Sequence, residues 1–191
     1  MVPIGRGTSA AWGMAEAGVG GEKVLARCGR GLPIAEMKLL PHTRSCFVCG
    51  ESNPAGLRLR FETDGRMVQT RFVPRPEHVG FRETVHGGLI ATLLDEIMVW
   101  ACAVQTKRFA YCAELNVRFI SPARPKDGLI ASGELVSDRR GRLYEAKAEL
   151  KNEAGAVLAT ASGKYLPIRE ADATQMATDF VEDPSWVFGK E

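Results

Sequence analysis

Residues 86–105 read HGGLIATLLDEIMVWACAVQ and form the most apolar segment of the chain. Apolar side chains recur there three and four positions apart and also fill the neighbouring face, which is typical of an α-helix buried on most sides. We therefore expect a helix from Gly87 to about residue 105. Three polar residues, Thr92, Asp95 and Glu96, interrupt the pattern, and their spacing places them on one narrow stripe of the helix.

Alternating apolar and polar residues surround this helix and predict β-strands. Leu57, Leu59 and Phe61 face one way, so a strand is expected there, and a turn at 63–65 leads to a second strand at about 67–72. Beyond the helix, glycine-containing turns separate four further alternating segments, at 115–119, 129–135, 144–150 and 157–165. This order predicts an α+β fold, in which an antiparallel sheet wraps around one long central helix and small inner residues leave room for it.

The composition divides the chain into three parts. Residues 1–40 are rich in glycine without an apolar period, which predicts a poorly ordered N-terminal extension. Met37 would also suit a natural start, which leaves open whether residues 1–36 belong to the protein. Residues 41–168 hold the predicted helix and strands, and residues 169–191 form a polar tail in which a short helix is expected.

Charge and cysteine content narrow the class of protein. A net charge of +2 over 191 residues gives no broad basic field, so no nucleic-acid partner is expected. The longest apolar run, Ile97 to Val104, is far shorter than the roughly 20 residues that span a bilayer, so no membrane partner is expected either. Five irregularly spaced cysteines and the lack of a leader pattern favour a cytoplasmic protein.

The start of the central helix and one carboxylate on it are the main candidates for chemistry. A helix start exposes unpaired backbone N–H groups, and Gly87 and Gly88 let a carbonyl oxygen approach them, as an oxyanion hole requires. Asp95 supplies a general base or a nucleophile. At about 1.5 Å per residue, Asp95 lies roughly 12 Å from Gly87 along the helix, too far to act on the same carbonyl. Two copies paired with antiparallel helices would bring the Asp95 of one beside the Gly87 of the other, so we expect a homodimer.

Three segments of the chain resemble the hotdog-fold acyl-CoA thioesterases of the PaaI-like group. They are HGGLIATLLDEIM, the preceding CFVCGESNPAGLRLRF and the following ELNVRFISPARPKDGLIASGEL, and the resemblance extends from about Cys46 to Pro167. It implies hydrolysis of acyl-CoA to a free acid and CoA, with the amide of Gly87 polarising the thioester carbonyl and Asp95 acting as base or nucleophile. It also implies a dimer or a dimer of dimers, with no metal and no cofactor beyond the CoA of the substrate.

Further positions have weaker assignments in the same reaction. His86 either orients the thioester or bonds the turn, and Thr92 either contacts substrate or fills space. Relatives often carry Asn or Gln where this chain has Gly80, and His78 is a possible substitute. The acyl group is expected to lie against Phe81, Leu94, Met98 and Trp100. The phosphates of CoA favour basic or polar partners, for which the candidates are Asn116, Arg118, Arg139, Arg140 and Arg142, although such residues are often merely solvated.

The remaining signals favour structural interpretations. His42, Cys46 and Cys49 have zinc-ligand spacing, but a fourth ligand is missing from the sequence pattern, so a plain turn is favoured. Glu96 points about 100° from Asp95, which favours a dimer or surface contact, and Cys102 and Cys112 are expected in the core. Two alternative functions stay open on the same fold: a non-catalytic acyl-CoA binding or sensing module, and an acyl-CoA dehydratase or hydratase.

Overall fold

The computed structural model describes residues 36–188, so most of the predicted N-terminal extension lies outside the described residues. The described chain forms one compact unit. Its start differs from the predicted boundary at residue 40, because Lys38–Leu39 already forms strand β1 and pairs with Glu62–Thr63. Leu40 is buried directly after this strand.

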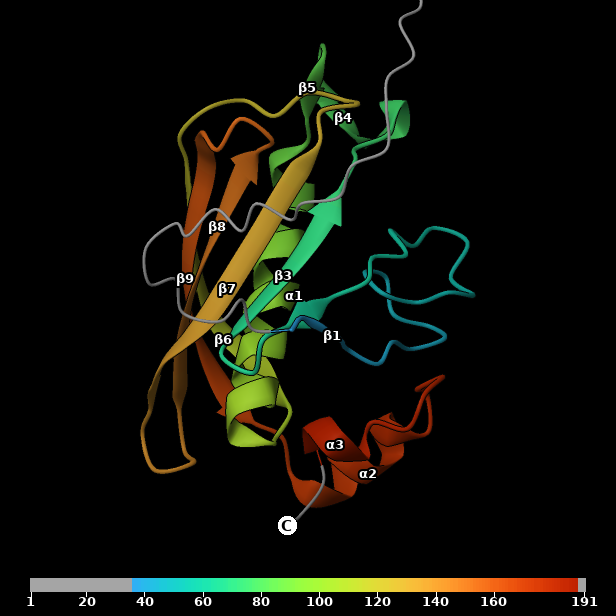
Figure 1. Cartoon of the computed structure of the whole chain (residues 1–191), viewed down its shortest axis with the longest axis vertical. Helices are drawn as coiled ribbons and strands as arrows, with labels where there is room; N and C mark the ends of the chain where they lie inside the picture. The colour runs from blue at the N-terminus through green and yellow to red at the C-terminus, as the bar shows by residue number, and fades with distance from the viewer. Residues whose placement is uncertain (1–35, 189–191) are drawn as a thin grey trace, which may run out of the picture. The chain divides into compact units, whose positions relative to one another are not determined.

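An antiparallel sheet forms the larger layer of the unit, with strand order β1-β2-β3-β7-β8-β9-β6 (Figure 1). The strands after the helix extend the predicted segments at one or both ends. The bounds are β1 Lys38–Leu39, β2 Glu62–Thr63, β3 Met67–Phe72, β6 Ala110–Phe119, β7 Leu129–Asp138, β8 Tyr144–Asn152 and β9 Val157–Pro167. Strands β1 and β6 are the two edges of the sheet.

Helix α1, Gly87–Thr106, packs along one face of this sheet, as the periodicity predicts (Figure 1). A Cβ atom at Gly133 of β7 would lie 3.1 Å from the Cγ2 of Ile97, so glycine lets the helix approach the strand closely. Small buried residues on β7, β8 and β9 leave room in the same way: Ala131, Ala146, Ala148, Ala159 and Ala161. The expected sheet around a central helix is therefore confirmed.

The segment before β2 is the main departure from the predicted strands. Leu57, Leu59 and Phe61 are buried as the alternation indicates, but the backbone is not a strand there. Arg58 has φ of 56°, outside the β region, which interrupts regular pairing. Three short elements directly before α1 were also not predicted: the 3-10 helix η1 Pro76–His78, β4 Val79–Phe81 and β5 Thr84–Val85.

The C-terminal tail covers the end of α1. It contains the helices α2, Glu170–Ala177, and α3, Ser185–Phe188, and α3 contacts α1. Phe188 stacks on Phe109 with ring centroids 3.5 Å apart, next to Phe180 and Trp100. By length and composition α1 could also cross a membrane, but about half of its apolar stretch is buried inside this unit, as the core helix of many non-membrane proteins is.

Candidate active site

The start of α1 is capped by the side chain of His86. Its Nδ1 accepts a hydrogen bond of 2.9 Å from the N–H of Gly88, which gives His86 the structural role at the turn. No hydrogen bond within the described part of the chain uses the N–H of Gly87. Of the two glycine amides, Gly87 is thus the one free to meet a substrate oxygen.

Gly80 and His78 hold the capping histidine in place. A Cβ at Gly80 would lie 2.8 Å from the Cδ2 of His86, so the imidazole occupies the space that an Asn or Gln side chain would need. His78 is buried, its Nδ1 accepts from the backbone N–H of Arg75, and its carbonyl accepts from the N–H of His86. Burial, with the nearby positive charge of Arg75, lowers the pKa of His78. His78 therefore supports the turn, and its engaged ring is a poor substitute for the missing amide.

Asp95 lies midway along α1, and a tyrosine from β9 holds its carboxylate. The hydroxyl of Tyr165 donates a hydrogen bond of 2.9 Å to Oδ1 of Asp95. Burial, followed by the charge of Asp95, raises the pKa of Tyr165, so its hydroxyl stays a donor. Sequence reasoning missed this role, although Tyr165 is the one polar side chain among the inward-facing positions of the predicted last strand.

Asp95 and Gly87 line two different cavities of the described chain. Asp95 opens into a cavity of about 610 Å³, whose apolar wall includes Val99, Trp100 and Phe109. Gly87 opens into a second cavity of about 380 Å³, where the ring of Phe119 lies against it. One chain therefore does not bring the candidate base and the candidate oxyanion donor together.

The expected acyl-contacting residues divide between the cavity and the core. Trp100 lines the cavity beside Asp95. Leu94 and Met98 are fully buried in the core, and Phe81 is exposed on β4, so none of these three lines that cavity. The apolar positions of α1 repeat every three to four residues, and sequence alone did not tell which of them face the sheet.

The polar candidates lie at both ends of the molecule. Thr92 donates to the carbonyl of Gly88, within the helix itself. Asn116 and Arg118 are exposed on edge strand β6, and Arg118 precedes the Phe119 that touches Gly87. The arginines of the β7–β8 turn lie at the opposite end, where Arg108 contacts Gly141 after α1 has ended. The arginines of this β7–β8 turn are Arg139, Arg140 and Arg142. One chain therefore does not bring all the proposed phosphate ligands together.

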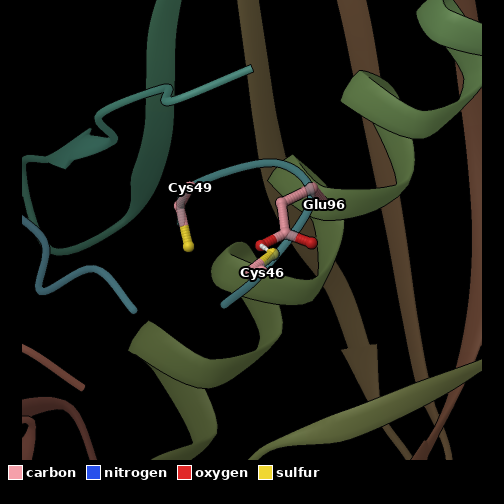
Figure 2. A group of neighbouring side chains, drawn as sticks. All are labelled: Cys46, Cys49 and Glu96. Carbon is pink, nitrogen blue, oxygen red and sulfur yellow. Dashed lines mark hydrogen bonds between the residues drawn. The ribbon is translucent and has the colours of Figure 1, made fainter. Parts of the chain in front are cut away.

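Glu96 and two cysteines form a cluster that the sequence did not predict (Figure 2). The Sγ of Cys46 lies 3.8 Å from Oε1 of Glu96, and Cys49 completes the group. Glu96 also lines the cavity that holds Asp95, while its expected role in a dimer or surface contact stays a prediction. Cys112 is exposed rather than buried as predicted, whereas Cys102 lies in the core.

The cluster perturbs the pKa values of its members. A hydrogen bond from the thiol of Cys49 lowers the pKa of Cys46 to about 6, and the same bond raises the pKa of Cys49. Burial, with the nearby charges of Cys46 and Asp95, raises the pKa of Glu96 to about 8. Cys46 is thus the more acidic of the two thiols. Glu96 ionises less readily than an ordinary glutamate, and a cation beside it would favour its charged form.

Comparison with known proteins shows which family the central part of this chain resembles. Residues 83–159, which include the start of α1, Asp95 and strands β6 to β8, match the family model of the thioesterase superfamily. The match covers less than half of the chain, so the chain is similar to this superfamily over the central helix and most of the strands that follow it. No curated protein matches the chain.

Solved structures of other proteins share the fold of this chain. A thioesterase superfamily protein is 26% identical, with a TM-score of 0.59, over 64% of this chain and 63% of that one, so less than two thirds of its length is matched. The PaaI protein of Escherichia coli, from the phenylacetic acid degradation operon, is 19% identical, with a TM-score of 0.54, over 59% of this chain and 81% of that one. A Streptococcus mutans protein bound to acetyl CoA is 20% identical, with a TM-score of 0.50, over 53% of this chain and 81% of that one. The hotdog fold expected from the sequence is confirmed, while the PaaI-like group stays a prediction.

Proposed function

We propose that this protein is a thioesterase superfamily member that hydrolyses an acyl-CoA to a free acid and CoA. The observation that carries the proposal is Asp95, a carboxylate held by Tyr165 on an otherwise apolar helix and open to a cavity with an apolar wall. The acyl chain would lie against that wall. The Streptococcus mutans structure with acetyl CoA indicates that this fold accommodates such a ligand.

The reaction needs Asp95 and Gly87 at one carbonyl, which points to a site shared by two copies of the chain. The two residues open into separate cavities of one chain, so a partner has to supply one of them. Edge strand β6 offers a surface for pairing, because its outer edge is free within the described unit and its side chains are largely exposed. An isologous pairing along β6 creates two equivalent sites per dimer.

In the proposed step, Asp95 acts on water as a general base. Its carboxylate takes a proton while the water oxygen bonds to the thioester carbon. The carbonyl oxygen becomes an oxyanion, which the N–H of the partner copy's Gly87 stabilises. The C–S bond then breaks, and the sulfur of CoA leaves with the proton that Asp95 returns. The alternative in which Asp95 attacks the carbon directly gives the same products through an acyl-enzyme anhydride. Neither route requires a metal or a redox cofactor.

Release of free CoA thiol from a panel of aromatic and aliphatic acyl-CoAs tests this function. Asp95→Asn keeps the size of the side chain and the contact with Tyr165, but removes the base, so we expect turnover to fall at least about a hundredfold with the oligomeric state unchanged. Turnover equal to that of the natural chain would overturn the assignment. Tight binding of acyl-CoA without thiol release would instead favour a binding module.

A further inference from the structure

Two cysteines from the loop before β2 meet one carboxylate from the middle of α1 (Figure 2). The Sγ atoms of Cys46 and Cys49 and a carboxylate oxygen of Glu96 all lie within 4.8 Å of one another. Zinc bonds of about 2.1 to 2.3 Å in tetrahedral geometry set such ligand atoms about 3.6 to 3.8 Å apart. Small side-chain movements therefore bring all three into ligand positions around one ion.

The loop is shaped around the sulfur of Cys46. The backbone N–H of Val48 donates to this Sγ at 3.2 Å, and the N–H of Gly50 donates to the carbonyl of Cys46 at 2.9 Å. A Cβ at Gly50 would lie 2.3 Å from that carbonyl oxygen, so only glycine permits the tight turn. Amide donors on a sulfur favour its thiolate form, which is the form that binds metal.

Among the described residues, the cavity beside the cluster is lined by further carboxyl groups and by no basic side chain. Besides Glu96, the described lining of this cavity contains Asp95 and Asp179, and it includes no lysine, arginine or histidine. Two arginines in this region are already engaged, since Arg44 donates to the carbonyls of Thr178 and Phe180, and Arg60 to those of Cys49 and Leu59. A partly buried carboxyl beside two thiols is stabilised by a proton or by a cation, and a metal ion is such a cation.

The indole of Trp100 gives independent support for a ligand here. Trp100 lines the same cavity with only 3% of its surface exposed, and its Nε1 has no hydrogen-bond partner. Its N–H lies on the side of Glu96 and favours the charged form of that carboxyl, lowering its pKa, without forming a hydrogen bond to it. When one carboxylate oxygen binds a metal, the other commonly accepts such a bond from a neighbouring group. A metal-bound Glu96 would therefore satisfy an otherwise unpaired buried donor.

We propose that Cys46, Cys49 and Glu96 bind a zinc ion. Two thiolates and a carboxylate suit Zn²⁺, and the fourth position faces the cavity, where a water completes the tetrahedron. The sequence pattern missed the third protein ligand because Glu96 follows Cys46 by 50 positions. His42, which the spacing offered as a ligand, instead contacts Glu51 and Glu182. The ion ties the loop to α1 beside Asp95 and fixes one wall of the cavity, independently of the proposed hydrolysis.

Metal analysis of the full chain, purified without a metal-binding tag under reducing conditions, tests the site. We expect about one zinc per chain, and after removal by chelator we expect Co²⁺ to restore a thiolate-to-cobalt absorption band. Cys46→Ser or Cys49→Ser should roughly halve this band and weaken Co²⁺ binding at least tenfold. Glu96→Gln should keep the band but weaken binding about tenfold or more, without changing the fold.

Cys112→Ser is the matched control, because Cys112 lines the same cavity but lies outside the cluster. It should retain the metal content and the cobalt band of the natural chain. The proposal is overturned if the metal-free chain takes up neither ion, if Cys112→Ser loses as much metal as Cys46→Ser, or if Glu96→Gln binds Co²⁺ as tightly as the natural chain. The Glu96 variant decides the matter even where a cysteine variant does not fold.

Discussion

The hydroxyl of Tyr165 orients the carboxylate of Asp95. Tyr165→Phe removes the donor but keeps the ring and its packing, so the folded structure should be retained. Hydrogen bonds to charged groups contribute about 1.5 to 3 kcal/mol, so we expect kcat to fall roughly tenfold to a hundredfold. KM should change little, because the lost bond positions the base and not the acyl group. Steady-state kinetics and a thermal melt measure both effects, and a loss confined to KM or to stability would contradict this role.

His78 makes the stability of the fold depend on pH. Its pKa in the folded state lies below the ordinary value of 6.5, so the folded chain binds fewer protons there than the unfolded chain. The stabilisation is thus present above about pH 6.5 and is lost as the pH falls toward the lower, folded-state value. We expect the free energy of unfolding in urea to drop over this interval, and to drop less in His78→Gln. Equal pH dependence of both chains would show that His78 is not the group responsible.

The residues of the proposed site differ in how far the sequence predicts them. Gly87 and Asp95 lie on one helix, so local periodicity is enough to identify them and to show that they are about 12 Å apart. Tyr165 and the partners of Glu96 come from distant segments, and their contacts arise only when the sheet and the loop pack on α1. Such contacts leave no periodic signal.

Helix α1 and the long strands were predictable because each has one consistent period over many residues. The segment around Arg58 also alternates, yet its backbone leaves the β region. Burial of alternate residues is therefore not sufficient evidence for a strand. Elements of two or three residues, such as β4 and β5, are held by their neighbours and carry no pattern of their own.

The packing of α1 on β7 depends on Gly133. Gly133→Ala places a methyl group 3.1 Å from the Cγ2 of Ile97, closer than ordinary van der Waals contact, and the helix cannot withdraw without opening the core. Overpacking of this kind costs about 1 to 3 kcal/mol, which urea denaturation measures. Ile97→Leu removes the contacting methyl group, so the double variant should recover part of the loss. Additive losses would indicate that the two positions do not contact each other.

In the proposed mechanism one chain alone does not form a complete active site, because its oxyanion donor and its base lie apart. The oxyanion donor lies at the start of α1, and the base lies at its middle beside Tyr165 and the cysteine cluster. Both groups belong to the same helix, which packs against the sheet, so their separation along the helix axis is fixed. Symmetric pairing through β6 would place the Asp95 of each copy beside the Gly87 of its partner, so that each site receives both groups.

Mixed dimers test this shared site directly. Gly87→Val fills the space in front of the amide, and Asp95→Asn removes the base, so each homodimer should be inactive. A heterodimer of the two variants, purified through two different tags, has one site with an intact Asp95 and an intact Gly87, and should show about half the natural activity. The matched control carries both substitutions on one chain and pairs it with an unchanged chain, which leaves each shared site with one defect. That dimer should be inactive if the sites are shared, and half active if each chain works alone.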